Sequence, residues 1–371
     1  MTLVFWASAL LVVFAYAGYP ALMFLYAQLR PKPIAKAPWL PTVTAVMSVY
    51  NGEAVVGSKL ENLLALDYPA ALFDIIVICD GCTDGTADAC RRFGERVTVL
   101  ESQERRGKAR GLDDAVAAAT GEILLMTDVR QRIELPALRE LVENFSDDGI
   151  GAVSGELRFE KAEGDFGGSV DAYWHYEKAI RLAESKTGSV VGVTGAFYAI
   201  RRSLYEPLPP GTVLDDVLIP MRVVKQGFRV VMDAYAVAWD QPSRSEGQER
   251  SRKIRTLAGN YQLVALAPWL LDPFANPIWF RFASHKLLRL AAPWLIVLIL
   301  LATILLAPRH PFYVLCLAGA IACAGLVWGG QRLPALRRSL PVKLLNAFWY
   351  MNLYSAQALI AYLRNPRLHL W

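Results

Sequence analysis

Carboxylates follow several apolar stretches of this chain, and their positions could support catalysis. Asp80 ends the run FDIIVICD (73–80) and Asp128 ends the run ILLMTD (123–128). The pair Asp215-Asp216 follows a turn rich in proline and glycine, PLPPGTVL. A carboxylate can accept the proton of an attacking hydroxyl, or hold a hard cation such as Mg²⁺. Each carboxylate alone is often only a helix cap, so the chemistry depends on whether the fold brings them together.

Two further groups of residues carry chemical potential. The basic run QERSRKIR (248–255) follows the aspartate pair by about thirty residues and could neutralise a phosphate. Cys79 and Cys82 have the spacing of a zinc or dithiol redox site. The chain has only five cysteines, however, and its four histidines are scattered, whereas a structural zinc site needs four ligands. Incidental cysteines are therefore favoured over a metal or redox site, and their scarcity indicates a reducing compartment.

Alternating strand and helix patterns predict the elements that must position these residues. Apolar runs predict strands over 43–49, 73–80, 97–102 and 122–128, and helical spacing predicts helices over 53–66, 107–120 and 134–145. This order predicts an α/β fold, with a mainly parallel sheet covered by helices. Ligands of such sheets bind beyond the carboxyl ends of the strands, where residues 50–53, Asp80 and Asp128 are expected.

Long apolar segments predict a membrane protein. The composition is 54% hydrophobic, and the segments 3–29, 290–307, 312–330 and 344–363 are each long enough to cross or nearly cross a bilayer. The fourth is the weakest because it carries Asn346, Asn352, Ser355 and Gln357. The first segment has no basic leader, so a retained anchor is favoured over a signal peptide. Basic residues after the first segment and between the third and fourth place the polar middle in the cytoplasm.

These patterns divide the chain into five parts. We expect an N-terminal transmembrane anchor over 1–29, a proline-rich linker over 30–41 and an α/β domain over 42–250. A basic motif and interfacial helices are expected over 251–286, with the stretch 261–282 lying at headgroup level. About three transmembrane helices are expected over 287–371.

Seven short motifs in this order resemble those of membrane-bound family 2 glycosyltransferases with the GT-A fold. That family includes cellulose, hyaluronan and poly-N-acetylglucosamine synthases, and enzymes that use lipid-linked acceptors. The resemblance covers nearly the whole chain. The motifs are SVYNGE (48–53), DGCTDGT (80–86), GKARGLDDA (107–115), TDVR (127–130), VTGAF (193–197), LDDV (214–217) and RKIRT (252–256).

The resemblance implies a role for each matching residue. Asp216 is the expected catalytic base, and its neighbour Asp215 raises the pKa of Asp216 by like-charge proximity. Donor binding is expected at Tyr50, Asn51, Glu53, Asp80, Lys108 and Asp128, and diphosphate binding at Arg252, Lys253 and Arg255. The acceptor side is expected at Thr194, Gly195, Ala196 and Thr256. Asp128 is the expected ligand of a divalent cation, Mg²⁺ or Mn²⁺.

This chain departs from the family pattern at two positions. Val129-Arg130 replace the second carboxylate of the metal motif, so either Arg130 or the diphosphate and water must complete the positive charge or the ligand set. Thr256 stands where chain-extending synthases carry a tryptophan that faces the growing glycan. The missing aromatic face favours the addition of one or a few sugars over processive synthesis.

The expected function is inverting transfer of a sugar from a nucleotide-diphosphate sugar, expected to be a UDP-sugar, to a hydroxyl of a lipid-linked or glycan acceptor. The expected place is the cytoplasmic face of the plasma membrane, the inner membrane of a bacterium. A homo-oligomer or polysaccharide-assembly partners are possible, and no nucleic-acid partner is expected. The alternatives are a processive polysaccharide synthase, a non-catalytic scaffold that has lost metal binding, and a redox membrane protein built on Cys79 and Cys82.

Overall fold

Eight strands form one sheet in the order β3-β2-β1-β4-β7-β6-β8-β5. The computed structural model describes residues 1–160, 167–242, 245–333, 336, 339–365 and 370. The strands are β1 (Val43–Val49), β2 (Phe73–Asp80), β3 (Val97–Ser102), β4 (Ile123–Thr127), β5 (Arg132–Ile133), β6 (Ile150–Phe159), β7 (Phe197–Arg201) and β8 (Arg229–Asp240). The pairs β1–β2, β2–β3, β1–β4 and β6–β8 are parallel, and β7 runs antiparallel between β4 and β6. The mainly parallel sheet predicted from the sequence is confirmed.

Both faces of the sheet are buried, because successive strand residues alternate between two hydrophobic cores. In β1, Ala45 and Met47 join one core and Val46 joins the other. The first core also contains apolar residues of α3 (Glu53–Leu64), α4 (Thr86–Arg91) and α6 (Ala137–Val142). The second contains residues of α5 (Lys108–Ala118), α8 (Asp215–Lys225), α9 (Glu246–Leu266) and α10 (Trp279–Phe282). Strands buried on both faces read as continuous apolar runs, which explains the pattern FDIIVICD.

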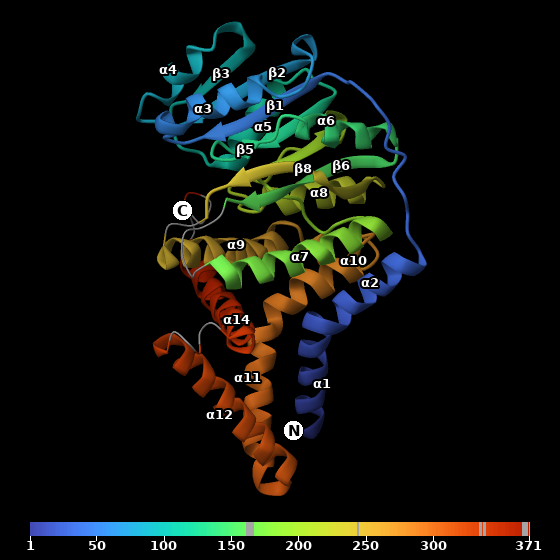
Figure 1. Ribbon diagram of the computed structural model, residues 1–371, viewed down its shortest axis with the longest axis vertical. Helices are drawn as coiled ribbons and strands as arrows, with labels where there is room; N and C mark the ends of the chain where they lie inside the picture. The colour runs from blue at the N-terminus through green and yellow to red at the C-terminus, as the bar shows by residue number, and fades with distance from the viewer. Residues whose placement is uncertain (161–166, 243–244, 334–335, 337–338, 366–369, 371) are drawn as a thin grey trace.

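Long helices continue from the sheet domain toward the opposite end of the molecule. Figure 1 shows α7 (Gly167–Thr187) and α9 beneath the sheet, with α1 (Thr2–Val13), α11 (Leu288–Leu306) and α12 (Pro311–Arg332) projecting away from it. In the described part of the chain, three helical segments are long and apolar enough to cross a membrane: Thr2–Leu29, Trp279–Arg309 and Pro311–Arg332. The first joins α1 to α2 (Tyr19–Leu29) through a π-helical turn.

The fourth predicted span forms a helix, α14 (Leu340–Arg364), but it is not among these three segments. Its polar residues explain the difference, because they lower the mean hydropathy of the helix, and two of them contact other elements. Ser355 Oγ donates to the Leu290 carbonyl at 3.1 Å, and Gln357 Oε1 accepts from Arg250 of α9 at 3.1 Å. The helix packs along α9, where the rings of Tyr261 and Tyr362 are stacked.

The predicted pair of interfacial helices over 261–282 does not form as such. The stretch from Tyr261 to Leu266 is the end of α9, and a short 3₁₀ turn, Pro268–Leu271, follows it. From Trp279 the chain then runs as one helical segment into the second candidate span, so that span begins eight residues before the expected boundary at 287. Prolines at 273 and 277 end the preceding turn, whereas no proline interrupts the chain again until Pro293.

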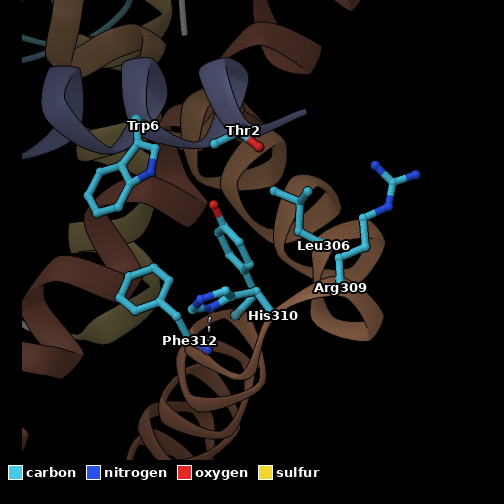
Figure 2. Close-up of a pocket in the computed structure, with 7 residues that line it drawn as sticks. Thr2, Trp6, Leu306, Arg309, His310 and Phe312 are labelled. Carbon is cyan, nitrogen blue, oxygen red and sulfur yellow. Dashed lines mark hydrogen bonds between the residues drawn. The ribbon is translucent and has the colours of Figure 1, made fainter.

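Aromatic side chains close the end of the molecule that lies away from the sheet. The turn between α11 and α12 packs against the start of α1, and Figure 2 shows the cavity of about 430 Å³ there. Phe312 stacks on Trp6 with the ring centroids 5.6 Å apart, and His310 Nδ1 accepts from the backbone N–H of Phe312 as the cap of α12. These contacts join the first candidate span to the other two.

Candidate active site

A lysine between carboxylates lies at the centre of the candidate site. Lys108 Nζ is 3.0 Å from Asp128 Oδ1 and 3.1 Å from Asp215 Oδ2, which has no hydrogen bond of its own among the described residues. Burial opposes the charge of Lys108, but Asp128, Asp215 and Asp216 outweigh burial and raise the pKa of the ammonium above its usual value. The fold therefore joins the predicted donor residues Lys108 and Asp128 to the predicted catalytic pair.

Asp80 fixes the position of Lys108 from behind. It is buried, and its two carboxylate oxygens accept the backbone N–H groups of Arg106 and Gly107 at 2.9 and 2.7 Å, immediately before α5 begins at Lys108. Gly81 lets these loops approach, because a Cβ at this left-handed position would lie 2.4 Å from the backbone nitrogen of Arg105. In this arrangement Asp80 acts first as a support for the loop that carries Lys108.

Asp216 has the electrostatic character of a general base. Burial, followed by the charge of Asp215, raises the pKa of Asp216 to about 6, while Lys108 and Lys286 act in the opposite direction. A carboxylate with such a pKa is ionised at neutral pH and is a stronger base than an exposed aspartate. Both aspartates lie in the first turn of α8, where the helix dipole favours negative charge.

The predicted acceptor loop lies against this base. A Cβ at Gly195 would be 3.0 Å from Asp216 Oδ2, so a larger residue there would press on the carboxylate. Thr194 is buried and bonded, since its hydroxyl donates to the Gly155 carbonyl at 2.9 Å. The Ala196 carbonyl accepts from the Thr127 hydroxyl at 3.0 Å. Gly195 thus leaves room for the Asp216 carboxylate, and Val193 N–H donates to the Asp216 carbonyl at 2.9 Å, whereas Thr194 and Ala196 hold the loop in place.

The loop after β1 is joined to the loop after β2 by reciprocal hydrogen bonds. The side chain of Asn51 accepts from Thr83 N at 2.8 Å and donates to Thr83 Oγ1 at 3.1 Å. Among the described residues, Asn51 is the one non-glycine residue with a positive φ, 49°. Glu53 accepts from Gly85 N at 3.0 Å. Tyr50 is half exposed and its ring carries the guanidinium of Arg105, 3.8 Å from the centroid. Arg105 thus covers one face of the Tyr50 ring and the rest of the ring is open to solvent, while Asn51 and Glu53 shape the loops.

The basic residues of α9 occupy different environments. Arg252 and Arg130 both approach Asp240 Oδ2, at 3.9 and 3.7 Å, so the loop after β4 and α9 meet at one buried carboxylate. Lys253 Nζ lies 3.7 Å from Glu249, and burial lowers the pKa of its ammonium. The side chain of Arg255 is partly buried, and its Nε has no hydrogen-bond partner among the described residues.

Thr256 follows on the same helix and is exposed. Its hydroxyl donates to the Arg252 carbonyl one turn earlier, at 3.0 Å. The side chain therefore presents little besides a methyl group to solvent, as expected from its type.

Two lysines near the carboxylates were missed in the sequence. Lys59 is buried, and its Nζ donates to Thr127 Oγ1 at 2.9 Å and to the Gln131 carbonyl at 2.7 Å, so it supports both ends of the loop that carries Asp128. Burial lowers the pKa of Lys59 to about 7, against the influence of Asp128. The sequence did contain a sign of this role: Lys59 follows Val56 by three residues and therefore lies on the apolar face of the predicted helix. Lys286 gave no such signal, because it precedes a predicted span far from any motif.

The side chains around Asp128 supply only some of the oxygen ligands that a metal ion needs. Within the described residues, no group of three or more histidine, cysteine, aspartate or glutamate side chains is arranged to hold an ion. Asp128 is 39% exposed, so its carboxylate can be reached from solvent. A divalent cation needs about six oxygen ligands, so a cation at Asp128 would take most of them from a diphosphate and water.

The cysteines that opened the alternative of a redox site form no disulfide in the described chain. The hydrogen bond that the Cys79 thiol donates to Cys90, followed by burial, raises the pKa of Cys79, which makes Cys79 less reactive. Cys82 Sγ lies 3.4 Å from both the Asn51 N–H and the Val49 carbonyl. These thiols serve as packing groups in the loop after β2.

A curled sheet with carboxylates and a lysine at its carboxyl edge defines the GT-A class of glycosyltransferases. The sequence profile described as "Glycosyltransferase like family 2" matches residues 41–259, and the chain belongs to that family. Poly-beta-1,6-N-acetyl-D-glucosamine synthase of Staphylococcus aureus is 24% identical over 267 residues, which cover 70% of this chain and 63% of the relative. The probable glycosyltransferase YdaM of Bacillus subtilis is 24% identical over 240 residues, which cover 61% of this chain and 56% of the relative. The chain thus spans less than two thirds of the length of these curated relatives.

One solved structure resembles nearly the whole chain. It is the mannosyltransferase PcManGT from Pyrobaculum calidifontis, in complex with GDP-Man and Mn²⁺. The two chains superpose with a TM-score of 0.73 and are 26% identical, and the alignment covers 97% of this chain and 99% of the other. The predicted family and fold class are confirmed, and the chain is a family 2 glycosyltransferase related to polysaccharide synthases.

The contribution of Lys286 to the site can be tested through pH dependence. The positive charge of Lys286 lowers the pKa of Asp216, so Lys286→Met should raise it. Because the ionised form is the base, the acid limb of the kcat/KM profile should move to higher pH, by about 0.5 unit or more, which is about 0.7 kcal/mol. Lys286→Arg should keep the wild-type limb. Lys225→Met, at the other end of α8, is the matched control. An unmoved limb in a folded Lys286→Met variant would remove Lys286 from the site.

Proposed function

We propose that this chain transfers a sugar from a nucleotide-diphosphate sugar to an acceptor hydroxyl, with inversion at the anomeric carbon and Asp216 as the base. The observation that supports the proposal most directly is the cluster of Asp128, Asp215 and Asp216 around Lys108, with the pKa of Asp216 raised to about 6. A scaffold without activity would not need two neighbouring like charges, one of them buried, because such a pair is costly to keep.

In the proposed reaction the acceptor oxygen attacks the anomeric carbon as the bond from that carbon to the diphosphate breaks. Asp216 takes the hydroxyl proton, and the electron pair of the broken bond leaves with the nucleoside diphosphate. Positive charge develops on the sugar ring and negative charge on the leaving group. Asp215 and Asp216 stabilise the first charge, whereas Lys108, Arg130 and Arg252 are the cations proposed to stabilise the second.

A divalent cation, Mg²⁺ or Mn²⁺, would supply further charge at the diphosphate. Asp128 is the residue proposed to hold it, and the solved mannosyltransferase that resembles this chain contains Mn²⁺. For the donor base, we propose that Tyr50 provides an aromatic surface and that Asp80 borders the pocket. The motifs favour a uridine nucleotide, whereas the solved structure contains GDP-Man, so both bases belong in a binding test.

We propose that the enzyme lies in a membrane, with its sheet domain on the cytoplasmic side and a lipid-linked or glycan acceptor. Three helical segments long enough to cross a bilayer support the first part. The link from Asp216 to Lys286, at the start of the second span, supports an acceptor held close to the membrane surface.

The function is tested by Asp216→Asn. The amide cannot take the proton, so transfer should fall by about 10²–10⁴-fold while donor binding persists. Binding is measured by calorimetry with UDP- and GDP-sugars, and transfer with the radiolabelled form of the sugar that binds. Asp148→Asn, at a fully exposed position between α6 and β6, is the control. Near-normal transfer by a folded Asp216→Asn variant would assign the role of base to Asp215. If the wild-type protein binds neither UDP- nor GDP-sugars, the transferase proposal is refuted.

The metal is tested by chelation. Activity should fall in EDTA and return with Mg²⁺ or Mn²⁺, and Asp128→Ala should show the same loss without rescue. Asp67→Ala, an exposed aspartate remote from the site, should behave as wild type. Full activity of wild type in EDTA would assign the whole electrostatic role to Lys108, Arg130 and the α9 cations.

Product length separates single addition from processive synthesis. Thr256 is exposed and presents no ring to a glycan, and the described chain has three candidate spans to build a conduit, so we expect one or a few sugars per acceptor. The relationship to poly-beta-1,6-N-acetyl-D-glucosamine synthase favours the processive alternative. The measurement is the size of labelled product made in nanodiscs. A high-molecular-weight ladder made without added acceptor would establish the processive enzyme.

A further inference from the structure

A second cavity lies at the opposite end of α8 from the aspartate pair. Its volume is about 560 Å³, within the usual range of ligand pockets. It is enclosed by the end of α2, the end of α7, the turn after α8 and the chain that enters α10. Figure 1 shows α2 and α10 meeting below α8 at this side of the molecule. The cavity touches the C-terminal end of α8, whereas Asp215 and Asp216 begin that helix, about 14 Å away along its axis.

Three cations line this cavity, and no aspartate or glutamate is among its described lining residues. Arg281 is buried and donates to the carbonyls of Glu184 and Ser189 at 2.6 and 2.8 Å. Arg229 donates to backbone carbonyls as well, including that of Lys32 at 3.0 Å. Carbonyl oxygens orient a guanidinium but carry no formal charge to pair with it.

The described residues supply no ion pair to Arg229, Arg281 or Lys32. The pKa of Arg229 is lowered by burial, with Asp147 acting against burial and the neighbouring Arg281 adding to it. Asp147 and Glu184 act on these two arginines only from beyond ion-pair distance. Two arginines held close together without a carboxylate within 4 Å among the described residues, beside the exposed amine of Lys32, form a site that favours an anion.

The position of the cavity indicates where that anion comes from. Tyr26 lies in the last turn of the first candidate span, and Phe280 lies in the first turn of the second, so the cavity opens at the level where both spans end. Both rings are partly exposed, as expected for aromatics at a membrane interface. Phe274, three residues before the lining residue Pro277, is 98% exposed, which is costly in water but favourable at a lipid surface.

We propose that this cavity binds the phosphate of an anionic phospholipid from the surrounding bilayer, with Arg229, Arg281 and Lys32 as its cationic wall. The aromatic rings of Tyr26 and Phe280 face the glycerol and acyl region. The bound lipid stabilises the junction between the first span, the linker and the sheet domain. The inference rests on the membrane placement proposed above and is independent of which sugar is transferred.

Lys32→Glu is the test, because the side chain is exposed and its backbone N–H bond to the Lys186 carbonyl remains. Full-length protein is placed in phosphatidylcholine nanodiscs that contain a minor fraction of phosphatidylglycerol, and lipid retained after transfer to detergent is counted by native mass spectrometry. Wild type and Lys32→Arg should retain one phosphatidylglycerol. Lys32→Glu should retain at least about tenfold less phosphatidylglycerol, because the substitution reverses one charge next to an anionic headgroup.

Arg30→Glu is the matched control. It makes the same charge change two residues earlier, at an exposed position outside the cavity, and should retain the lipid as wild type does. Equal losses in both variants would show a diffuse surface attraction and overturn the site. Displacement of the lipid by inorganic phosphate at low concentration would assign the cavity to a free anion, and displacement by UDP- or GDP-sugar would assign it to the donor. Release of the protein from membranes by carbonate would instead refute the membrane placement, whatever its transferase activity.

Discussion

The site depends on the ammonium group of Lys108, which keeps Asp128 and Asp215 about 3 Å from one positive charge. At this separation an ion pair contributes up to about 5 kcal/mol at an effective dielectric constant of 20, before the cost of desolvation. Without the lysine, the carboxylates at the end of β4 and the start of α8 would repel each other, and one of them would tend to become protonated. Asp80 extends this constraint to β2, because it fixes the loop that begins α5. One charge therefore sets the relative positions of three elements around the proposed donor.

A second charged network joins the sheet domain to the helices that could cross a membrane. The ring nitrogens of His285, near the start of the second candidate span, lie 2.7 and 2.8 Å from Glu177 and Glu184 of α7. Tyr19 of the first span donates to Glu184 as well. Burial opposes the charge of Glu177, but His285 and Arg289 outweigh burial and hold its pKa well below the usual value. Buried charges of this kind need defined partners, so they specify how the spans dock. Lys286, next to His285, thereby reaches the electrostatic environment of Asp216.

Much of the fold could be predicted because its signals are local. The four parallel strands follow from short apolar runs, and β1 and β2 begin and end where the sequence predicts. Of the residues predicted to bind the donor or to act as base, Lys108, Asp128, Asp215 and Asp216 converge because they sit at a strand end or a helix start, which a parallel sheet gathers at one edge. The fate of α14 and of the segment 261–282 could not be predicted in the same way. Both have intermediate hydropathy, and the choice between lipid and protein depends on which polar partners the fold supplies, such as the Leu290 carbonyl for Ser355.

The sequence by itself determined the residue types of the site, the order of the strands along the chain and the apolar segments, since each depends on side-chain chemistry and spacing within about twenty residues. Only the tertiary structure decided which charges meet. Lys108 bridges Asp128 and Asp215, Lys59 supports the loop of Asp128, and Arg130 shares Asp240 with Arg252. These pairs join residues from 12 to more than 100 positions apart, and the energy of each depends on distance and burial, which no local pattern contains.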